Sequence, residues 1–280
     1  MRINKMKSLL LVAVLTTLVS ATYTTDLTIS TCNSSGCTPA KKRIALDVTS
    51  NHTSPTGEEL INVQNDTLTM TYGGPEVGGP RVYLIEEDGT NKNYMFMLKN
   101  QEFTFDVELS TMPCGFNAAL YFVGMPENEG GAETGTKYCD AQAVAGTFCS
   151  EMDIMEANTK AQQYTTHGCI DTCGSFNDSD EKCQGTPGQQ KTTCDQSGCG
   201  LNPFRYGPGT TYNDEYNNSV WYGEGAGFKL DSTKKYTVVT QFATDDKTAS
   251  GTLSEIYRFY VQDGNRIELP TLYVKTPTDG

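Results

Sequence analysis

The sequence has few of the residues that bind metals in proteins. It contains two histidines, His52 and His167, and its ten cysteines include no C-x2-C pair. Structural zinc sites usually combine such a cysteine pair with further Cys or His ligands. A zinc site is therefore disfavoured, and we expect neither a metal ion nor another cofactor.

Positive charge is also scarce. The chain has 21 Lys and Arg residues against 34 Asp and Glu, which gives a formal net charge of −13. Nucleic acids and anionic membrane surfaces are repelled by such a protein. A neutral polymer such as a glycan is not repelled, and it remains a candidate partner.

Long apolar runs are absent except at the start of the chain. Residues 1–21 have a basic beginning, an apolar run over 9–19 and small residues at the end. This order predicts a secretory signal peptide, because the run is short for a membrane span. Its removal takes away three positive charges and no negative ones, which lowers the formal charge from −13 to −16. We expect a secreted, extracellular protein that does not bind membranes.

The cysteines all follow residue 21 and are expected to form disulfides in an oxidising compartment. They are Cys32, Cys37, Cys114, Cys139, Cys149, Cys169, Cys173, Cys183, Cys194 and Cys199. Glycosylation sequons begin at Asn33, Asn51, Asn65, Asn177 and Asn217. Sequons of this type fit a secreted protein of a eukaryote.

The chain shows no linker or internal repeat, so residues 22–280 are predicted to form one domain. Apolar side chains alternate with period two over 68–72, 103–109 and 257–261, which predicts strands. The Asp263-Gly264 step predicts a hairpin turn. Residues 168–227 are rich in Gly, Asn, Asp and Cys and are typical of long loops. The pattern predicts an all-β fold, an antiparallel sandwich or jelly roll with function on one face.

The segment CGFNAALYFVGM indicates where that face lies. Ala118, Leu120 and Phe122 share one side of the predicted strand and suit a core. Asn117 and Tyr121 share the other side, where their amide and phenol could contact a sugar.

Three acids crowd the segment CSEMDIMEAN. Glu151 and Asp153 have the spacing of neighbours on one face of a strand, whereas Glu156 has the opposite parity. Glu156 joins the same face only if a β-bulge absorbs one residue between Asp153 and Glu156. The segment therefore predicts a bulge if the three acids act together.

Together, the acids would suit a retaining glycosidase. Such enzymes place two carboxyl groups about 5 to 5.5 Å apart, one a nucleophile and the other an acid and then a base. Asp153 beside Glu151 would share a proton or a hydrogen bond, which keeps one of them ionised. A solvated acidic strand edge or a calcium-binding loop is the alternative interpretation.

Several segments resemble glycoside hydrolase family 7, the fungal-type cellulases. CSEMDIMEAN resembles the catalytic strand of that family. LTISTCNSSGCT, QEFTFDVELSTMPCGFNAALYFV, YCDAQ, TTCDQSGCGLNPFRYG, LDSTKKYTVVTQF and SGTLSEIYRFYVQDG resemble further family segments in the same order. The resemblance implies a concanavalin-like β-jelly-roll of two antiparallel sheets with long disulfide-linked loops.

The resemblance also implies roles for particular residues. Glu151 would be the nucleophile, Asp153 its partner, Glu156 the acid/base, and His167 a histidine near the leaving group. The residues implied to line the glucan cleft are Asn117, Tyr121, Asp140, Gln142 and Arg258; Asp140 and Gln142 also have the parity to share a face. The implied disulfides join Cys32 to Cys37, Cys139 to Cys149, Cys169 to Cys194, and Cys173 to Cys183, which leaves Cys114 and Cys199 unpaired.

The chain departs from the family pattern in three ways. It ends soon after RIELPTLYVKTPTDG, it lacks segments after His52 and between Gln142 and Gly146, and Trp221 is its only tryptophan. Met155 stands where the family usually has a tryptophan, an aromatic ring on which a sugar could pack. Residues 22–280 would then be an incomplete catalytic domain with an open groove.

The expected function is a secreted, monomeric, retaining endo-β-1,4-glucanase acting on cellulose or related β-glucans. Two alternatives remain: an exo-acting cellobiohydrolase of the same family, and a truncated or inactive glycan-binding relative.

Overall fold

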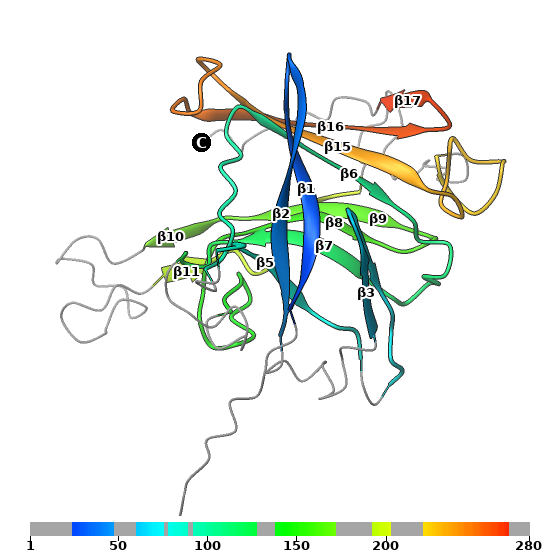
Figure 1. Cartoon of the computed structure of the whole chain (residues 1–280), viewed down its shortest axis with the longest axis horizontal. Coiled ribbons are helices and arrows are strands. Elements are labelled where there is room, and N and C mark those ends of the chain that lie inside the picture. Colours follow the sequence, from blue (N-terminus) through cyan, green and yellow to red (C-terminus); the bar gives the residue numbers. More distant parts are fainter. Residues whose placement is uncertain are drawn as a thin grey trace, which may run out of the picture. The chain divides into compact units, whose positions relative to one another are not determined.

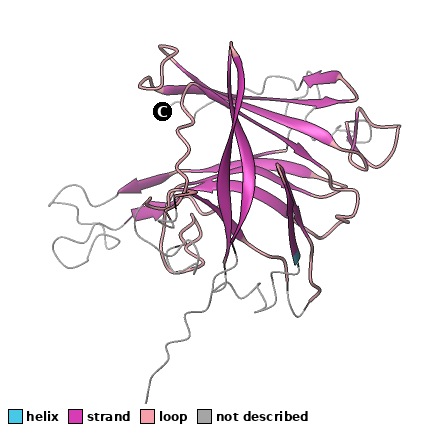
Figure 2. Ribbon diagram, in the orientation of Figure 1, coloured by secondary structure: helices cyan, strands magenta, loops and turns pink. Residues whose placement is uncertain are grey.

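A computed structural model describes residues 24–47, 60–75, 78–88, 92–127, 138–171, 192–202 and 221–268. These residues form strands joined by loops and turns (Figure 2), so the predicted all-β fold is confirmed. The chain divides into two compact units, residues 1–91 with 131–136 and residues 92–130 with 137–280. In the described part, no helix is long and apolar enough to cross a membrane.

The described residues of the first unit form five antiparallel strands. The strands β1 (Thr24–Asn33), β2 (Gly36–Leu46) and β5 (Val82–Ile85) form one sheet, and β3 (Ile61–Gln64) pairs with β4 (Thr67–Met70). Ile44, Leu46 and Ile61 form its buried apolar cluster. The disulfide Cys32–Cys37 closes the turn between β1 and β2.

The second unit contains two four-stranded antiparallel sheets (Figure 1). One has the order β12 (Cys199–Leu201), β9 (Gln162–His167), β8 (Glu151–Ala157) and β7 (Ala118–Val123). The other has the order β17 (Asn265–Glu268), β16 (Leu253–Gln262), β15 (Tyr236–Thr244) and β6 (Gln101–Val107). Short pairs are formed by β10 (Cys169–Asp171) with β11 (Thr192–Cys194) and by β13 (Tyr222–Gly223) with β14 (Leu230–Asp231).

A hydrophobic core joins the two large sheets of this unit. Met155 of β8 packs in one cluster with Val238 of β15 and Tyr260 of β16, all of them buried. The rings of Phe103 in β6 and Phe122 in β7 meet edge to face with centroids 5.0 Å apart. The sheets therefore form a sandwich, as the sequence pattern predicts.

Turn chemistry explains the hairpin of β16 and β17. Asp263 and Gly264 have φ values of 52° and 77°, both in the left-handed region that a tight two-residue turn requires. The predicted hairpin is confirmed.

The structure only partly agrees with the prediction of long loops over 168–227. Strands β10, β11 and β12 lie in this region, and β12 extends the sheet that carries the three acids. Strands of three residues have too little alternation to be recognised by period. The predicted Cys173–Cys183 disulfide lies outside the described residues.

Met155 does not occupy a place where a sugar could stack. Its side chain is 4% exposed and belongs to the core cluster, opposite Leu120 of β7, which packs against the same cluster. The interpretation of Met155 as a lost sugar platform is therefore wrong for this chain, because a larger ring there would enter the core between the sheets.

Candidate active site

A β-bulge in β8 brings the three acids onto one face. Asp153 pairs with Thr165 of β9 and Glu156 with Gln163, so three steps along β8 match two along β9, and the register shifts between them. The extra residue restores the parity of Glu156. The predicted bulge is confirmed.

The same face continues across the neighbouring strands. Across β7, Asp153 is opposite Tyr121 and Glu156 is opposite Ala119; across β9, Glu151 is opposite His167. Ala119 is exposed, so this side of β7 is open to solvent. The four residues predicted to be catalytic therefore lie on one side of the sheet, and the core lies on the other.

Asp153 is the buried centre of the acidic group. It is 5% exposed, and its Oδ2 lies 3.1 Å from Nε2 of His167, which is 7% exposed. Glu151 accepts a hydrogen bond from the backbone N–H of Ala141 at 3.0 Å. Asp153 and His167 are thus buried and in contact, whereas Glu151 is only half-buried.

Burial and like charge change the protonation of this set. Burial raises the pKa of Asp153 to about 7, and the neighbouring charges of Glu151 and Glu156 act in the same direction. Burial alone lowers the pKa of His167, but the hydrogen bond to the Asp195 carbonyl and the charges of Asp153 and Glu151 outweigh it, so the pKa is raised. Asp153 therefore keeps a proton at pH values where an exposed aspartate has lost it.

Glu156 lies beside a hollow in the surface. Asn117 donates a hydrogen bond from Nδ2 to Oε1 of Glu156 at 2.8 Å. The hollow has a volume of about 360 Å³, and its lining includes Asn117, Glu156, Gln163 and Asn202. A carboxyl group with an amide donor beside an open hollow can transfer a proton to a bound molecule.

The residues predicted to bind glucan are not all brought together. Tyr121 shares the face of the acids, and its hydroxyl accepts a hydrogen bond from the hydroxyl of Tyr138 at 3.1 Å. Gln142 is exposed, and its Nε2 donates to the carbonyl of Gln196 at 3.3 Å.

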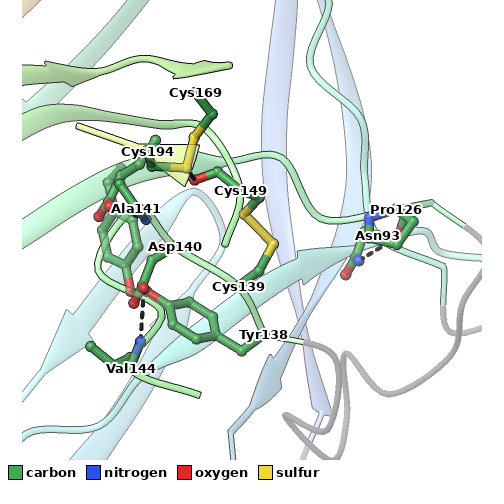
Figure 3. The surroundings of a disulfide bond; sticks show 12 residues. Asn93, Pro126, Tyr138, Cys139, Asp140, Ala141, Val144, Cys149, Cys169 and Cys194 are labelled. Carbon is green, nitrogen blue, oxygen red and sulfur yellow. Dashed lines mark hydrogen bonds between the residues drawn. A yellow bond between two sulfur atoms is a disulfide. The ribbon is translucent and has the colours of Figure 1, made fainter. Parts of the chain in front are cut away.

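Asp140 serves a turn. Its side chain is 2% exposed, and Oδ1 accepts the N–H of Val144 at 3.0 Å (Figure 3). The expected shared face of Asp140 and Gln142 is not present, because the chain turns directly after Asp140 and strand parity does not apply.

Arg258 lies between the two sheets, away from the acids. It is 3% exposed, and its Nη2 donates to Oγ1 of Thr240 at 2.9 Å. Its guanidinium lies over the ring of Tyr164, 4.3 Å from the centroid. Tyr164 alternates with Gln163 and Thr165 in β9 and therefore points to the other side of the sheet.

Two neighbouring disulfides hold one end of the site (Figure 3). Cys149, two residues before Glu151, is joined to Cys139, and Cys169, two residues after His167, is joined to Cys194. The sulfur of Cys194 lies 3.6 Å from the carbonyl oxygen of Cys149. With Cys32–Cys37, the three implied disulfides whose cysteines lie in the described residues are present; Cys114 and Cys199 are free and exposed.

Sequence reasoning missed several residues of this face. Gln163 and Thr165 alternate with His167 in β9, and that spacing could have placed them beside the acids. Gly200 of β12 pairs with Thr165, and a Cβ there would meet Nε2 of Gln163 at 2.5 Å.

In the part of the chain that is described, no group of three His, Cys, Asp or Glu side chains is arranged to hold a metal ion.

Comparison of the sequence with models of protein families shows to which family the chain belongs. The family model described as "Glycosyl hydrolase family 7" matches residues 56–148 and 143–279, which is most of the sequence. The chain belongs to glycosyl hydrolase family 7. The family assignment agrees with the all-β sandwich and with the acids on one face of its sheet.

Curated relatives of this family 7 chain carry the name of a glucanase. The "Endo-beta-1,4-glucanase celB" of Aspergillus oryzae is 40% identical over 233 residues, covering 74% of this chain and 51% of the relative. The "Probable endo-beta-1,4-glucanase celB" of Aspergillus terreus is 43% identical over 209 residues, covering 68% and 45%. The chain therefore spans about half the length of the curated relatives that it matches.

Solved structures of the family share the fold. The native endocellulase EGI of Humicola insolens has a TM-score of 0.68 at 31% identity, covering 88% of this chain and 72% of that one. A family 7 cellobiohydrolase from Daphnia pulex has a TM-score of 0.69 at 27% identity, covering 93% and 74%. The family 7 neighbours thus include both an endocellulase and a cellobiohydrolase.

Proposed function

We propose that this family 7 chain is a secreted, monomeric, retaining glycosidase that cleaves internal β-1,4 bonds of cellulose or related β-glucans. The observation that carries the proposal is the bulge in β8, which places Glu151, Asp153 and Glu156 on one open face. The endoglucanase name of the Aspergillus oryzae relative supports the bond type. The net charge of −13 is compatible with a neutral polysaccharide.

In the first step, Glu151 attacks the anomeric carbon while Glu156 protonates the oxygen of the leaving sugar. The glycosidic C–O bond breaks, and a covalent glycosyl-enzyme forms on Glu151. The backbone N–H of Ala141 holds Oε2 of Glu151. Asp153, with its pKa raised to about 7, holds the proton beside Glu151 so that Glu151 stays ionised.

In the second step, Glu156 removes a proton from water, and the oxygen of that water attacks the anomeric carbon. The bond to Glu151 breaks, and the sugar leaves with its original anomeric configuration. Asn117 donates to Oε1 of Glu156 and orients the carboxyl group for both proton transfers. Asn117, Tyr121 and Gln142 are our proposed sugar contacts, whereas Asp140 shapes the turn beside them.

Proton NMR of the first product tests the mechanism. On a soluble β-1,4-glucan, the wild type should release the β-anomer before mutarotation, and Glu151→Gln should release none. An α-anomer as first product, or wild-type activity in Glu151→Gln, would contradict the proposal. Asp106→Asn, a change at an exposed aspartate of β6, serves as the control for the substitution itself.

Whether the enzyme cleaves internal bonds or releases cellobiose from chain ends is tested on the same substrate. Cleavage of internal bonds lowers viscosity much faster than it releases reducing ends. A slow fall in viscosity with release of cellobiose would instead indicate the exo-acting alternative. Binding of the glucan without any hydrolysis would indicate the glycan-binding alternative and overturn the enzyme proposal.

A further inference from the structure

The imidazole of His167 contacts more than the acids. Its Nδ1 lies 2.8 Å from the carbonyl oxygen of Asp195, in the turn between β11 and β12. The carboxylate of Asp195 accepts the backbone N–H groups of Ser197 at 3.1 Å and Gly198 at 3.0 Å. The side chain of Asp195 thus holds the turn that presents its own carbonyl to His167.

Gly198 gives the imidazole its space. A Cβ on Gly198 would meet Nδ1 and Cε1 of His167 at 2.6 Å and Cγ2 of Thr165 at 2.5 Å. Gly198 also has a φ of 66°, a conformation that side chains other than glycine adopt at a cost. A larger residue would therefore push the ring away from its present place.

The turn is anchored at its beginning. The N–H of Asp195 donates to the carbonyl of Gly168 at 2.9 Å, directly after His167. The disulfide Cys169–Cys194 joins the same two segments. The distance between the Asp195 carbonyl and the imidazole is therefore constrained by a covalent link and a backbone hydrogen bond.

The contact to a carbonyl decides which nitrogen carries the proton. A carbonyl oxygen only accepts hydrogen bonds, so Nδ1 of His167 must be the N–H donor. Nε2 then has a hydrogen only when the ring is an imidazolium. Across the 3.1 Å contact, one proton is therefore shared, either on Nε2 facing the Asp153 carboxylate or on Asp153 facing neutral Nε2.

We propose that Asp195 and Gly198 are positioning residues that fix His167 in the Nδ1–H tautomer, so that His167 and Asp153 hold one proton between them beside Glu151. The consequence for catalysis rests on the function proposed above, whereas the tautomer and the shared proton do not. Among the described residues, the titratable groups that face the pair include Glu151 and Glu156 from β8 and Tyr121, which is opposite Asp153 across β7; the Asp195 carboxylate is engaged with the turn.

The tautomer is measurable in the intact chain by NMR of ¹⁵N-labelled histidine. The sequence has two histidines, so in a His52→Gln variant all side-chain histidine signals come from His167. Above the pKa of the ring, the wild type should show a protonated Nδ1 and an unprotonated Nε2. A wild-type spectrum with the proton on Nε2 would overturn the proposal without any further variant.

Three substitutions test the turn. Asp195→Ala and Gly198→Ala should each give mixed tautomers and lower the pKa of His167, because the hydrogen bond to the Asp195 carbonyl raises it. Asp195→Asn keeps an oxygen acceptor for the two backbone N–H groups and should retain the wild-type spectrum. Ser197→Ala, an exposed change in the same turn, is the matched control. A wild-type spectrum in either Asp195→Ala or Gly198→Ala would overturn the proposal.

Activity gives a second readout. In Asp195→Ala and Gly198→Ala, the alkaline limb of kcat/KM should move to lower pH with little change in KM, and Asp195→Asn should restore it. If the NMR results are as expected but the wild type hydrolyses no glucan, the proposed function fails and the assignment of the turn stands. An unchanged pH profile in an active Gly198→Ala enzyme would contradict the positioning role.

Discussion

At the scale of single residues, the site depends on where each acid is buried. Asp153 is nearly inaccessible and lies beside Glu151 and His167, whereas Glu156 borders an open hollow. A buried acid among like charges keeps its proton, and an acid at a hollow can exchange one with a bound molecule. The different environments separate the proposed roles of acids that are close in sequence.

Replacing Asp153 with Asn tests its proposed role. The amide keeps the shape of the side chain but cannot exchange a proton with Glu151 or His167. We expect kcat/KM for a soluble glucan to fall by about 10²-fold, mainly through kcat. The control is Asp106→Asn, whose carboxylate contacts Thr237 and Lys235. Full activity with an unchanged pH profile in Asp153→Asn would contradict the role of Asp153.

The sequence predicted much of the site at this scale but misplaced Arg258 and Met155. Alternation along one strand indicates which residues share a face, and it predicted the bulge. Asn117 precedes β7, but its hydrogen bond to Glu156 brings it to the acids, and Tyr121 is opposite Asp153. It does not say whether a face of β16 is turned toward the other sheet or toward solvent. That depends on which sheet packs against it, a long-range property that no local pattern contains.

At the scale of elements, the disulfides and the turns position the strand ends. The loop closed by Cys139 and Cys149 carries the Ala141 N–H that binds Glu151. The turn between β11 and β12 carries the Asp195 carbonyl that contacts His167. Strand β12 was not expected from the sequence, because its three residues include a glycine and have no clear period. The family resemblance supplied the disulfide pairs, which spacing alone could not select.

Removing the Cys139–Cys149 disulfide tests the positioning of Glu151. The bridge closes a loop with a sequence separation of 10, and Cys139→Ser with Cys149→Ser should lower the free energy of unfolding by about 2 to 3 kcal/mol. We also expect lower kcat at a temperature where the variant is fully folded, since the Ala141 N–H is then less constrained.

The control for this change is Cys32→Ser with Cys37→Ser in the first unit, which should cost stability without lowering kcat. Denaturant unfolding and initial rates measure the two effects separately. A kcat equal to that of the wild type in the folded Cys139 and Cys149 variant would show that the loop does not position Glu151.

At the scale of the whole molecule, the buried acid links stability to pH. Folded Asp153 has its pKa raised to about 7, so between about pH 4 and pH 7 it holds a proton that the unfolded chain has lost. Its contribution to the free energy of unfolding therefore falls as pH rises through this window. His167, with a raised pKa, also loses its contribution as pH rises through its folded value.

The expected result is a difference between two proteins. The free energy of unfolding of Asp153→Asn minus that of the wild type should increase by about 3 kcal/mol between pH 4 and pH 7. Asp106 and Asp231 have lowered pKa values and lose their contribution as pH falls, but they are the same in both proteins and cancel. Denaturant titrations at several pH values measure the difference, and a constant difference would contradict a buried, protonated Asp153.

The central claim is that Glu151 forms a covalent bond to the sugar. A 2-deoxy-2-fluoro-cellobioside with a good leaving group slows both steps, so that the glycosyl-enzyme accumulates and can be mapped by peptide mass spectrometry. The structure and the family assignment predict one added 2-deoxy-2-fluoro-cellobiosyl mass, located on Glu151 and absent from Glu151→Gln. A label on Glu156 or another residue, or turnover of the compound without any covalent adduct, would contradict the account.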